Sequence, residues 1–281
     1  MTLSPHSATP VYASAAIFAW GTSDFLGGYA ARRANAFLFT ALFNLGGLAV
    51  VLALAFGSGA APPSRQGAMW IVTGGILGSA GVALFFKALA MGRMGLIAPV
   101  SAVLGAAIPA VYSIFTEGMP RPVAIAGFAF AAVGLWLITR TEDGNSPKGL
   151  GLAVLAGLGF AGYYLCMRQG GSGSPFWFAV LTRVGGLLVT GIIVALTGTF
   201  REVTGSLVRL AVVAGTIDSV GTMVFVLASQ SGRLDEAVVI SSLYPAVTVL
   251  LARIVLKEQF TRWKLVGLLA ALASVPMIAA G

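Results

Sequence analysis

The segment "FLFTALFNLGGLAV" (37–50) returns 139 residues later as "FWFAVLTRVGGLLV" (176–189), with two Phe, the Gly-Gly pair and a Val in the same places. A shift of 140 aligns further positions over most of the chain. These are Gly75/Gly215, Ser79/Ser219, Gly81/Gly221, Phe85/Phe225, Ala88/Ala228, Gly92-Arg93/Gly232-Arg233, Ser101/Ser241 and Gly127/Gly267. A nearly constant shift indicates an internal duplication. We therefore predict a first repeat over 1–143 and a second over 144–281.

The composition places both repeats in a membrane. Hydrophobic residues make up 58% of the chain and charged residues only 9%, which is too apolar a mixture to bury inside one globule. Apolar runs of about 20 residues, the length that crosses a bilayer, recur ten times. They lie near 10–31, 36–57, 67–91, 95–116, 122–140, 149–168, 175–198, 207–230, 235–256 and 263–280. The sequence predicts an all-α membrane protein of ten transmembrane helices with no soluble domain.

Five spans per repeat have a consequence for orientation. An odd number of spans makes the second copy enter the membrane upside down relative to the first, so we expect two inverted five-helix repeats. Secondary transporters use this architecture, because two halves that exchange conformations open a central site alternately to either side.

The basic residues predict which way the chain is inserted. Their spread through short loops fits membrane topology and not a nucleic-acid surface, so no nucleic-acid partner is expected. On the side of the termini lie Arg65, Arg121, Arg168 and Arg233; on the other lie Arg32, Arg33, Arg93, Arg140, Lys148, Arg201, Arg209, Arg253, Lys257, Arg262 and Lys264. By the positive-inside rule, both termini should be non-cytoplasmic in the cell inner (plasma) membrane.

Several functional classes lack their residues here. Cys166 is the single cysteine and His6 the single histidine, so the chain offers no disulfide and no thiol cluster for a metal. It has no HExxH motif and no GxSxG on a helix, so an intramembrane enzyme is disfavoured and no catalytic residue, cofactor or metal is predicted. A secondary transporter and a passive facilitator or channel remain open.

Four charges fall at least four residues inside the ends of predicted spans, where charges are costly and usually have a partner or a function. They are Asp24, Lys87, Arg183 and Asp218. Their depths allow two ion pairs, Asp218 with Arg183 and Asp24 with a Lys87 that could also snorkel to the interface. These pairs either lock helices together or handle a substrate or a proton.

The stretch "WGTSD" favours the functional reading for Asp24. It places Trp20, Thr22, Ser23 and Asp24 within little more than one helical turn, which supplies a ring, hydroxyls and a carboxylate. Such a set suits an amino group on a substrate.

The sequence resembles the EamA family of the drug/metabolite transporter superfamily, whose members have ten spans in two five-helix repeats. The resemblance rests on "AWG" (19–21), on Pro245, Glu258 and Gly267 within "SSLYPAVTVLLARIVLKEQFTRWKLVGLLAALAS" (241–274), and on a weaker echo at Pro109, Glu117 and Gly127. The family includes exporters of amino acids and other small metabolites, YddG-like proteins among them. A multidrug-type exporter has the same fold and is the alternative.

The resemblance implies further residues at a central cavity. Trp20, Tyr163, Tyr164 and Tyr244 fall in spans that line the cavity in the family, and Ser241 lies beside them in the sequence. The expected substrate-binding set is therefore Trp20, Thr22, Ser23, Asp24, Tyr163, Tyr164, Ser241 and Tyr244. The expected partners are a small-molecule substrate, such as an amino acid, the lipid bilayer, and a coupling proton if Asp24 carries one.

Overall fold

The computed structural model describes residues 5–92, 94–139, 148–257 and 262–279, and these residues form helices and no strand. The first part of the chain contains α1 (Pro5–Ala31), α2 (Ala36–Gly57), α3 (Arg65–Met91), α4 (Met94–Glu117) and α5 (Pro122–Thr139). The second contains α6 (Leu150–Gln169), α7 (Pro175–Thr197), the 3-10 turn η1 (Thr199–Glu202), α8 (Gly205–Ser231), α9 (Leu234–Ser241), α10 (Tyr244–Val255) and α11 (Arg262–Ala279). Glu258, Arg93 and Arg140, used above for the resemblance and the topology, lie outside the described residues.

Polar caps set where several helices begin. The Asn35 side chain accepts hydrogen bonds from the backbone N–H of Phe37 and Leu38 at the start of α2. Thr204 does the same for Leu207 at the start of α8. The first turn of a helix has unpaired N–H groups, and these side chains satisfy them. At Asn35 and Thr204 the capping residue thus marks the point where a loop ends and the next helix begins.

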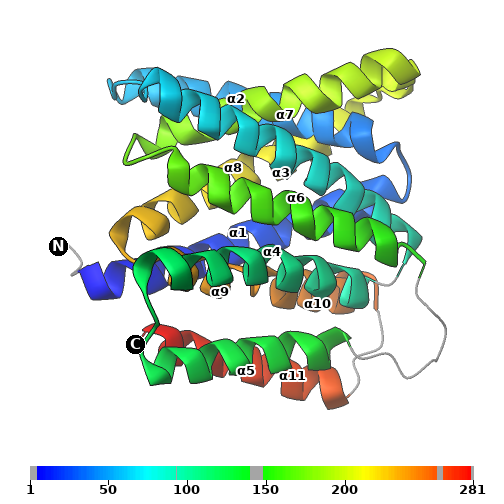
Figure 1. Cartoon of the computed structure of the whole chain (residues 1–281). Coiled ribbons are helices and arrows are strands. Elements are labelled where there is room, and N and C mark those ends of the chain that lie inside the picture. Colours follow the sequence, from blue (N-terminus) through cyan, green and yellow to red (C-terminus); the bar gives the residue numbers. More distant parts are fainter. Residues whose placement is uncertain (1–4, 93, 140–147, 258–261, 280–281) are drawn as a thin grey trace.

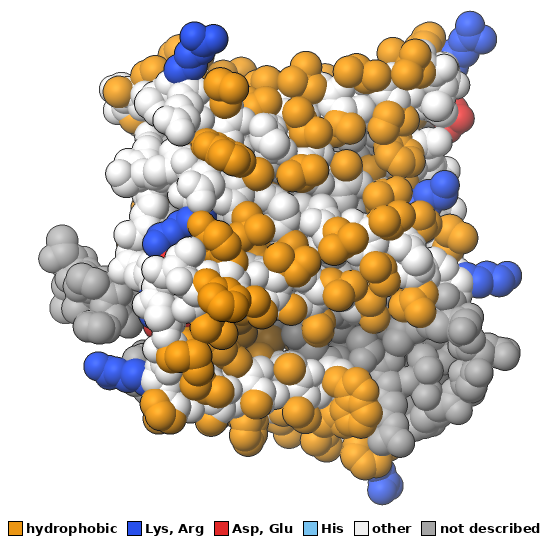
Figure 2. All heavy atoms as spheres, in the orientation of Figure 1, with side chains coloured by type: hydrophobic (Ala, Val, Ile, Leu, Met, Phe, Trp, Pro, Cys, Tyr) orange, Lys and Arg blue, Asp and Glu red, His pale blue; other side chains and the backbone are white. Residues whose placement is uncertain are grey.

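Among the residues that the structure describes, seven helical segments are long and apolar enough to cross a membrane. They are Ala36–Gly57, Arg65–Met91, Val100–Glu117, Leu150–Gln169, Pro175–Thr197, Gly205–Ser231 and Leu234–Val255. Large apolar side chains cover the outer surface; Phe115 is 85% exposed and Leu196 82%. Figure 2 shows hydrophobic side chains across one face, with Lys and Arg mostly near the two borders where the helices end. The chain is thus an all-helical, multi-pass membrane protein. The full count of ten spans stays a prediction.

The helices run side by side across the molecule (Figure 1). The helices α2 and α7 lie together at one side of the bundle and α5 and α11 at the other, with α1 passing through the middle. The first residues of α1 and the last of α11 lie at the same end of the bundle. The predicted ninth span, 235–256, is divided into α9 and α10 at Ser242 and Leu243.

Contacts between the two halves come in exchanged pairs. Helix α1 packs on α8, and α6 packs on α3. Likewise, α2 packs on α8 and α7 on α3, while α4 contacts α6 and α10 contacts α1. The helices α2 and α7, which carry the repeated Gly-Gly segment, pack on each other. This is the contact pattern expected of a two-fold relation between the repeats; their inverted orientation remains a prediction.

Glycines make these crossings possible. A Cβ on Gly215 of α8 would clash with the carbonyl oxygen of Phe43 on α2, and a Cβ on Gly75 of α3 would clash with that of Thr182 on α7. The two clashes occupy equivalent places in the two repeats. In lipid, close approach of small residues supplies packing energy that the hydrophobic effect cannot. The glycines shared by both repeats therefore fix the distance between helices around the centre.

Candidate functional site

A cavity of about 70 Å³ lies among α1, α3, α6, α7, α8 and α10. Both halves of the chain contribute to it. Its lining residues are Trp20, Asp24, Gly78, Ser79, Val82, Phe160, Tyr163, Tyr164, Thr182, Arg183, Asp218, Thr222 and Tyr244. Several come as pairs spaced by four residues on one helix face, such as Trp20 with Asp24 and Asp218 with Thr222. The volume holds several water molecules or the head group of a small ligand.

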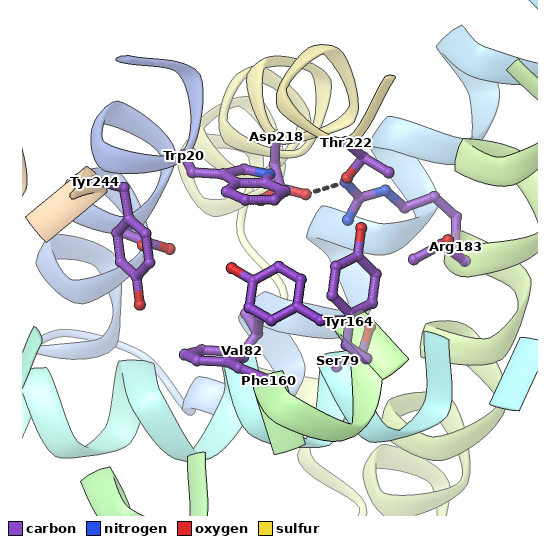
Figure 3. Close-up of a pocket in the computed structure, with 13 residues that line it drawn as sticks. Trp20, Ser79, Val82, Phe160, Tyr164, Arg183, Asp218, Thr222 and Tyr244 are labelled. Atoms are coloured by element: carbon purple, nitrogen blue, oxygen red, sulfur yellow. Dashed lines mark hydrogen bonds and ion pairs between the residues drawn. The ribbon is translucent and has the colours of Figure 1, made fainter. Parts of the chain in front are cut away.

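The strongest polar feature of the cavity is an ion pair between Arg183 on α7 and Asp218 on α8. Arg183 is 3% exposed and also donates from Nε to Ser219 Oγ at 3.1 Å and from Nη1 to Asn44 Oδ1 at 3.2 Å. Its guanidinium lies 5.0 Å from the centre of the Phe43 ring. Each of its three nitrogens thus has a partner. The pair with Asp218, which neutralises the arginine charge, is marked in Figure 3.

The repeat alignment explains the neighbours of this pair. Asn44 occupies the place in α2 that Arg183 occupies in α7, and Ser79 is the counterpart of Ser219. Ser79 Oγ donates to Asn44 Oδ1 at 3.4 Å, as Ser219 meets Arg183 in the second half. Asn44 and Ser79 were missed by the search for charges because both are neutral. The alignment of the two repeats could have identified them, because Asn44 aligns with Arg183 and Ser79 aligns with Ser219.

Asp24 differs from Asp218 in having no basic partner. It is 7% exposed, lines the cavity from α1, and within the described parts of the chain it makes no ion pair or hydrogen bond. The predicted pair with Lys87 is wrong: Lys87 is exposed and lines a separate hollow with Arg32, Asn35 and other residues around the start of α2. The neighbouring Phe86 points at α1, where its ring would meet a Cβ on Gly27. Lys87, one residue on, therefore faces away from Asp24.

Aromatic rings form much of the remaining wall. The Trp20 ring centre lies 6.2 Å from that of Tyr164 and 5.2 Å from that of Phe225, and Tyr163 and Tyr164 are 5.3 Å apart. Trp20 lies close against α8 because Gly221 has no side chain; a Cβ there would come within 2.6 Å of the indole. Figure 3 shows Trp20, Tyr164, Phe160 and Tyr244 around the open space. The site is a cavity lined largely by aromatic rings, and it includes one carboxylate, that of Asp24, without a basic partner.

Tyr244 owes its position to the break between α9 and α10. It is the first residue of α10 and is followed by Pro245, which has no N–H to continue the helix from α9. The Tyr244 hydroxyl is buried without a hydrogen-bond partner among the described residues. The adjoining backbone is tied to α1, since Thr248 Oγ1 donates to the Gly21 carbonyl at 3.0 Å. Tyr244 therefore lines the cavity, while its hydroxyl oxygen is enclosed by the protein.

The structure brings five of the eight predicted substrate-binding residues to the cavity: Trp20, Asp24, Tyr163, Tyr164 and Tyr244. Thr22, Ser23 and Ser241 are not among its lining residues. Ser23 donates to the Ala214 carbonyl of α8 at 3.2 Å, and Ser241 to that of Val238 at 3.1 Å. Ser23 thus bonds a carbonyl of a neighbouring helix, and Ser241 a carbonyl of its own helix three residues back. Among the described residues there is also no cluster of three or more metal ligands.

A polar cluster closes the bundle at the end where α4 and α6 finish. Arg168 Nη2 lies 2.8 Å from Glu117 Oε1. Arg233, before α9, donates to the carbonyls of Glu117 at 3.2 Å and Gly118 at 2.9 Å, and pairs with the buried Asp235 at 2.9 Å. These contacts join α4 of the first half to α6 and α9 of the second.

Comparison with known proteins agrees with this architecture. Residues 147–280 match the model of the EamA-like transporter family. A solved structure described as "Crystal structure of protein" has a TM-score of 0.71 and 22% sequence identity, over 96% of this chain and 96% of that chain. No curated protein sequence matches significantly. The second half of the chain is therefore similar in sequence to the EamA-like transporter family, and the whole chain shares its fold with a solved structure.

Proposed function

We propose that the protein is a secondary transporter that exports small metabolites by alternating access. Amino acids are the class suggested by the sequence resemblance, and Asp24 supplies the cavity with a carboxylate for an amino group. The observation that carries the proposal is Asp24, a buried carboxylate without a basic partner in a cavity built by both halves. Ionisable groups inside membranes usually belong to substrate or proton pathways.

In this mechanism the two acidic residues have different roles. Asp218 remains paired with Arg183 and holds α7 to α8, while Asp24 binds either a substrate ammonium or a proton. Because the carboxylate can bind only one of them at a time, substrate leaving in one direction is coupled to a proton moving in the opposite direction. The Glu117–Arg168 and Arg233 contacts must open when the site faces that end of the bundle. We propose that inverted repeats supply the two access states.

Two other functions use the same fold. A multidrug-type exporter would accept varied molecules in the aromatic-lined cavity, and a passive facilitator would move them without a proton. An intramembrane enzyme is not favoured, because the lining residues include no nucleophile with an adjacent base.

Transport measurements separate these functions. Purified protein is reconstituted into proteoliposomes loaded with a mixture of amino acids, amines, organic acids and sugars, and loss of each component is followed by mass spectrometry. We expect an outward movement of amino compounds that an imposed pH gradient accelerates. Efflux unaffected by the gradient would indicate a facilitator, and no efflux beyond that of empty liposomes would contradict the proposal.

We also propose that both termini are non-cytoplasmic in the plasma membrane. The structure places the first residues of α1 and the last of α11 at one end of the bundle, away from exposed Arg33, Arg201 and Arg209. Basic residues favour the cytoplasmic side. We expect alkaline phosphatase fused to the C-terminus to be active and a green fluorescent protein fused there to be dark. The reverse pair of results would overturn this orientation.

A further inference from the structure

Resting on the proposed transport function, we infer that the substrate is a small organic cation with an apolar or aromatic body and no carboxylate: an amine and not an amino acid. The inference follows from the charges at the cavity. Two carboxylates and one guanidinium line it. The guanidinium is paired with Asp218, so Asp24 is the lining carboxylate that is left to pair with a cation when it gives up its proton.

An amino acid would bring a carboxylate that has no partner here. Arg183 is the one basic residue lining the cavity among those described, and its nitrogens already bond Asp218, Ser219 and Asn44. Drawing it to a substrate carboxylate would leave Asp218 buried and unpaired. Lys87 lies outside the cavity and is exposed. A buried charge without a partner is strongly unfavourable, so the site disfavours a zwitterion relative to a cation of the same body.

The walls favour a cation independently of Asp24. Trp20, Tyr164 and Tyr244 line the space around the carboxylate, and the face of an aromatic ring attracts a positive charge. A carboxylate placed among the same ring faces would be repelled. The carboxylate and the rings therefore both complement an ammonium group.

The volume restricts the size of the ligand. A cavity of about 70 Å³ holds an ammonium group and a few further atoms, so a larger body requires the walls to move outward as it enters. Val82 and Phe160 provide an apolar side for such a body. The predicted ligand has a compact charged head and a modest apolar body.

Four small molecules with one ring in common test the inference. Phenethylamine is a cation, phenylalanine adds a carboxylate, phenylalaninol has the size of phenylalanine without that carboxylate, and 2-phenylethanol lacks the amine. Their affinities for purified protein in lipid nanodiscs are measured by calorimetry at neutral pH. We expect both cations to bind at least about tenfold more tightly than 2-phenylethanol, which lacks the charge-assisted contact, and than phenylalanine, whose carboxylate has no partner.

Matched variants assign the preference to Asp24. We expect Asp24→Asn to remove the advantage of the two cations over 2-phenylethanol. Glu202→Gln removes the same charge from an exposed position outside the cavity and should leave the preference intact. Phenylalanine binding as tightly as phenylalaninol would overturn the inference, and so would binding of none of the four. The proposed function would be judged apart from either result, by efflux of the mixed metabolites.

Discussion

Replacing Asp24 with asparagine is expected to leave a folded protein whose proton-driven efflux is at least about tenfold slower. Asparagine keeps the shape of the side chain and its ability to hydrogen-bond, but it has neither the negative charge nor the exchangeable proton. A hydrogen bond to a charged group contributes about 1.5–3 kcal/mol, which corresponds to a loss of about 10-fold to 150-fold. Because Asp24 bonds no described residue, the change removes nothing that holds the helices together.

The measurement is the initial rate of efflux from proteoliposomes, with and without an inward pH gradient. Melting temperature and elution volume of the purified variant show that it is folded. Ser23→Ala is the neighbouring control: it removes a packing bond to the Ala214 carbonyl and no charge, so transport per folded molecule should be unchanged. Wild-type transport by a well-folded Asp24→Asn protein would remove the carboxylate from the mechanism.

The second large effect concerns the buried pair of Arg183 and Asp218. We expect Arg183→Gln and Asp218→Asn each to destabilise the protein by about 3–5 kcal/mol, because each leaves the opposite charge buried without a partner. The double variant should be more stable than either single one, since two neutral amides leave no stranded charge. This non-additivity is the signature of a direct pair.

Cys166 gives a convenient readout of unfolding. It is the single thiol and is buried, so a thiol-reactive dye reports when the structure opens. Arg168→Gln is the control, because Arg168 is 40% exposed and surface pairs contribute about 0–1 kcal/mol. Equal and additive losses from the two single variants would contradict the pair as a unit of stability.

Much of the helical fold could be predicted from the sequence. The predicted run at 36–57 coincides with α2, Ala36–Gly57, and the run at 207–230 lies within α8, Gly205–Ser231. Run length and capping residues carry this information, because a helix must be apolar for the thickness of the bilayer. The break within 235–256 was missed, although Pro245 signalled it. The hydropathy of a segment does not change when a single backbone N–H is absent, so hydropathy alone does not predict a break at a proline.

The site was harder to predict, for a geometric reason. Hydropathy and span length give the depth of a residue in the membrane but not the direction in which its helix presents it. Asp24 and Lys87 were assigned compatible depths, yet a rotation of one residue, from Phe86 to Lys87, turns the lysine outward. Rare intramembrane charges were visible in the sequence. The neutral Asn44 and Ser79, which complete the polar centre, carry no such mark and could be found only through their places at the counterparts of Arg183 and Ser219 in the repeat.

The facing positions of Asn44 and Arg183 bear on the evolutionary history of the chain. A dimer of two identical five-helix subunits could place only the same residue at both positions: two asparagines without a charge, or two guanidiniums close together. One arginine opposite one asparagine, with Asp218 in one half and Gly78 at its counterpart, requires two halves with separate codons. The predicted duplication within one chain would therefore let the two sides of the site carry different residues, which two identical subunits could not do.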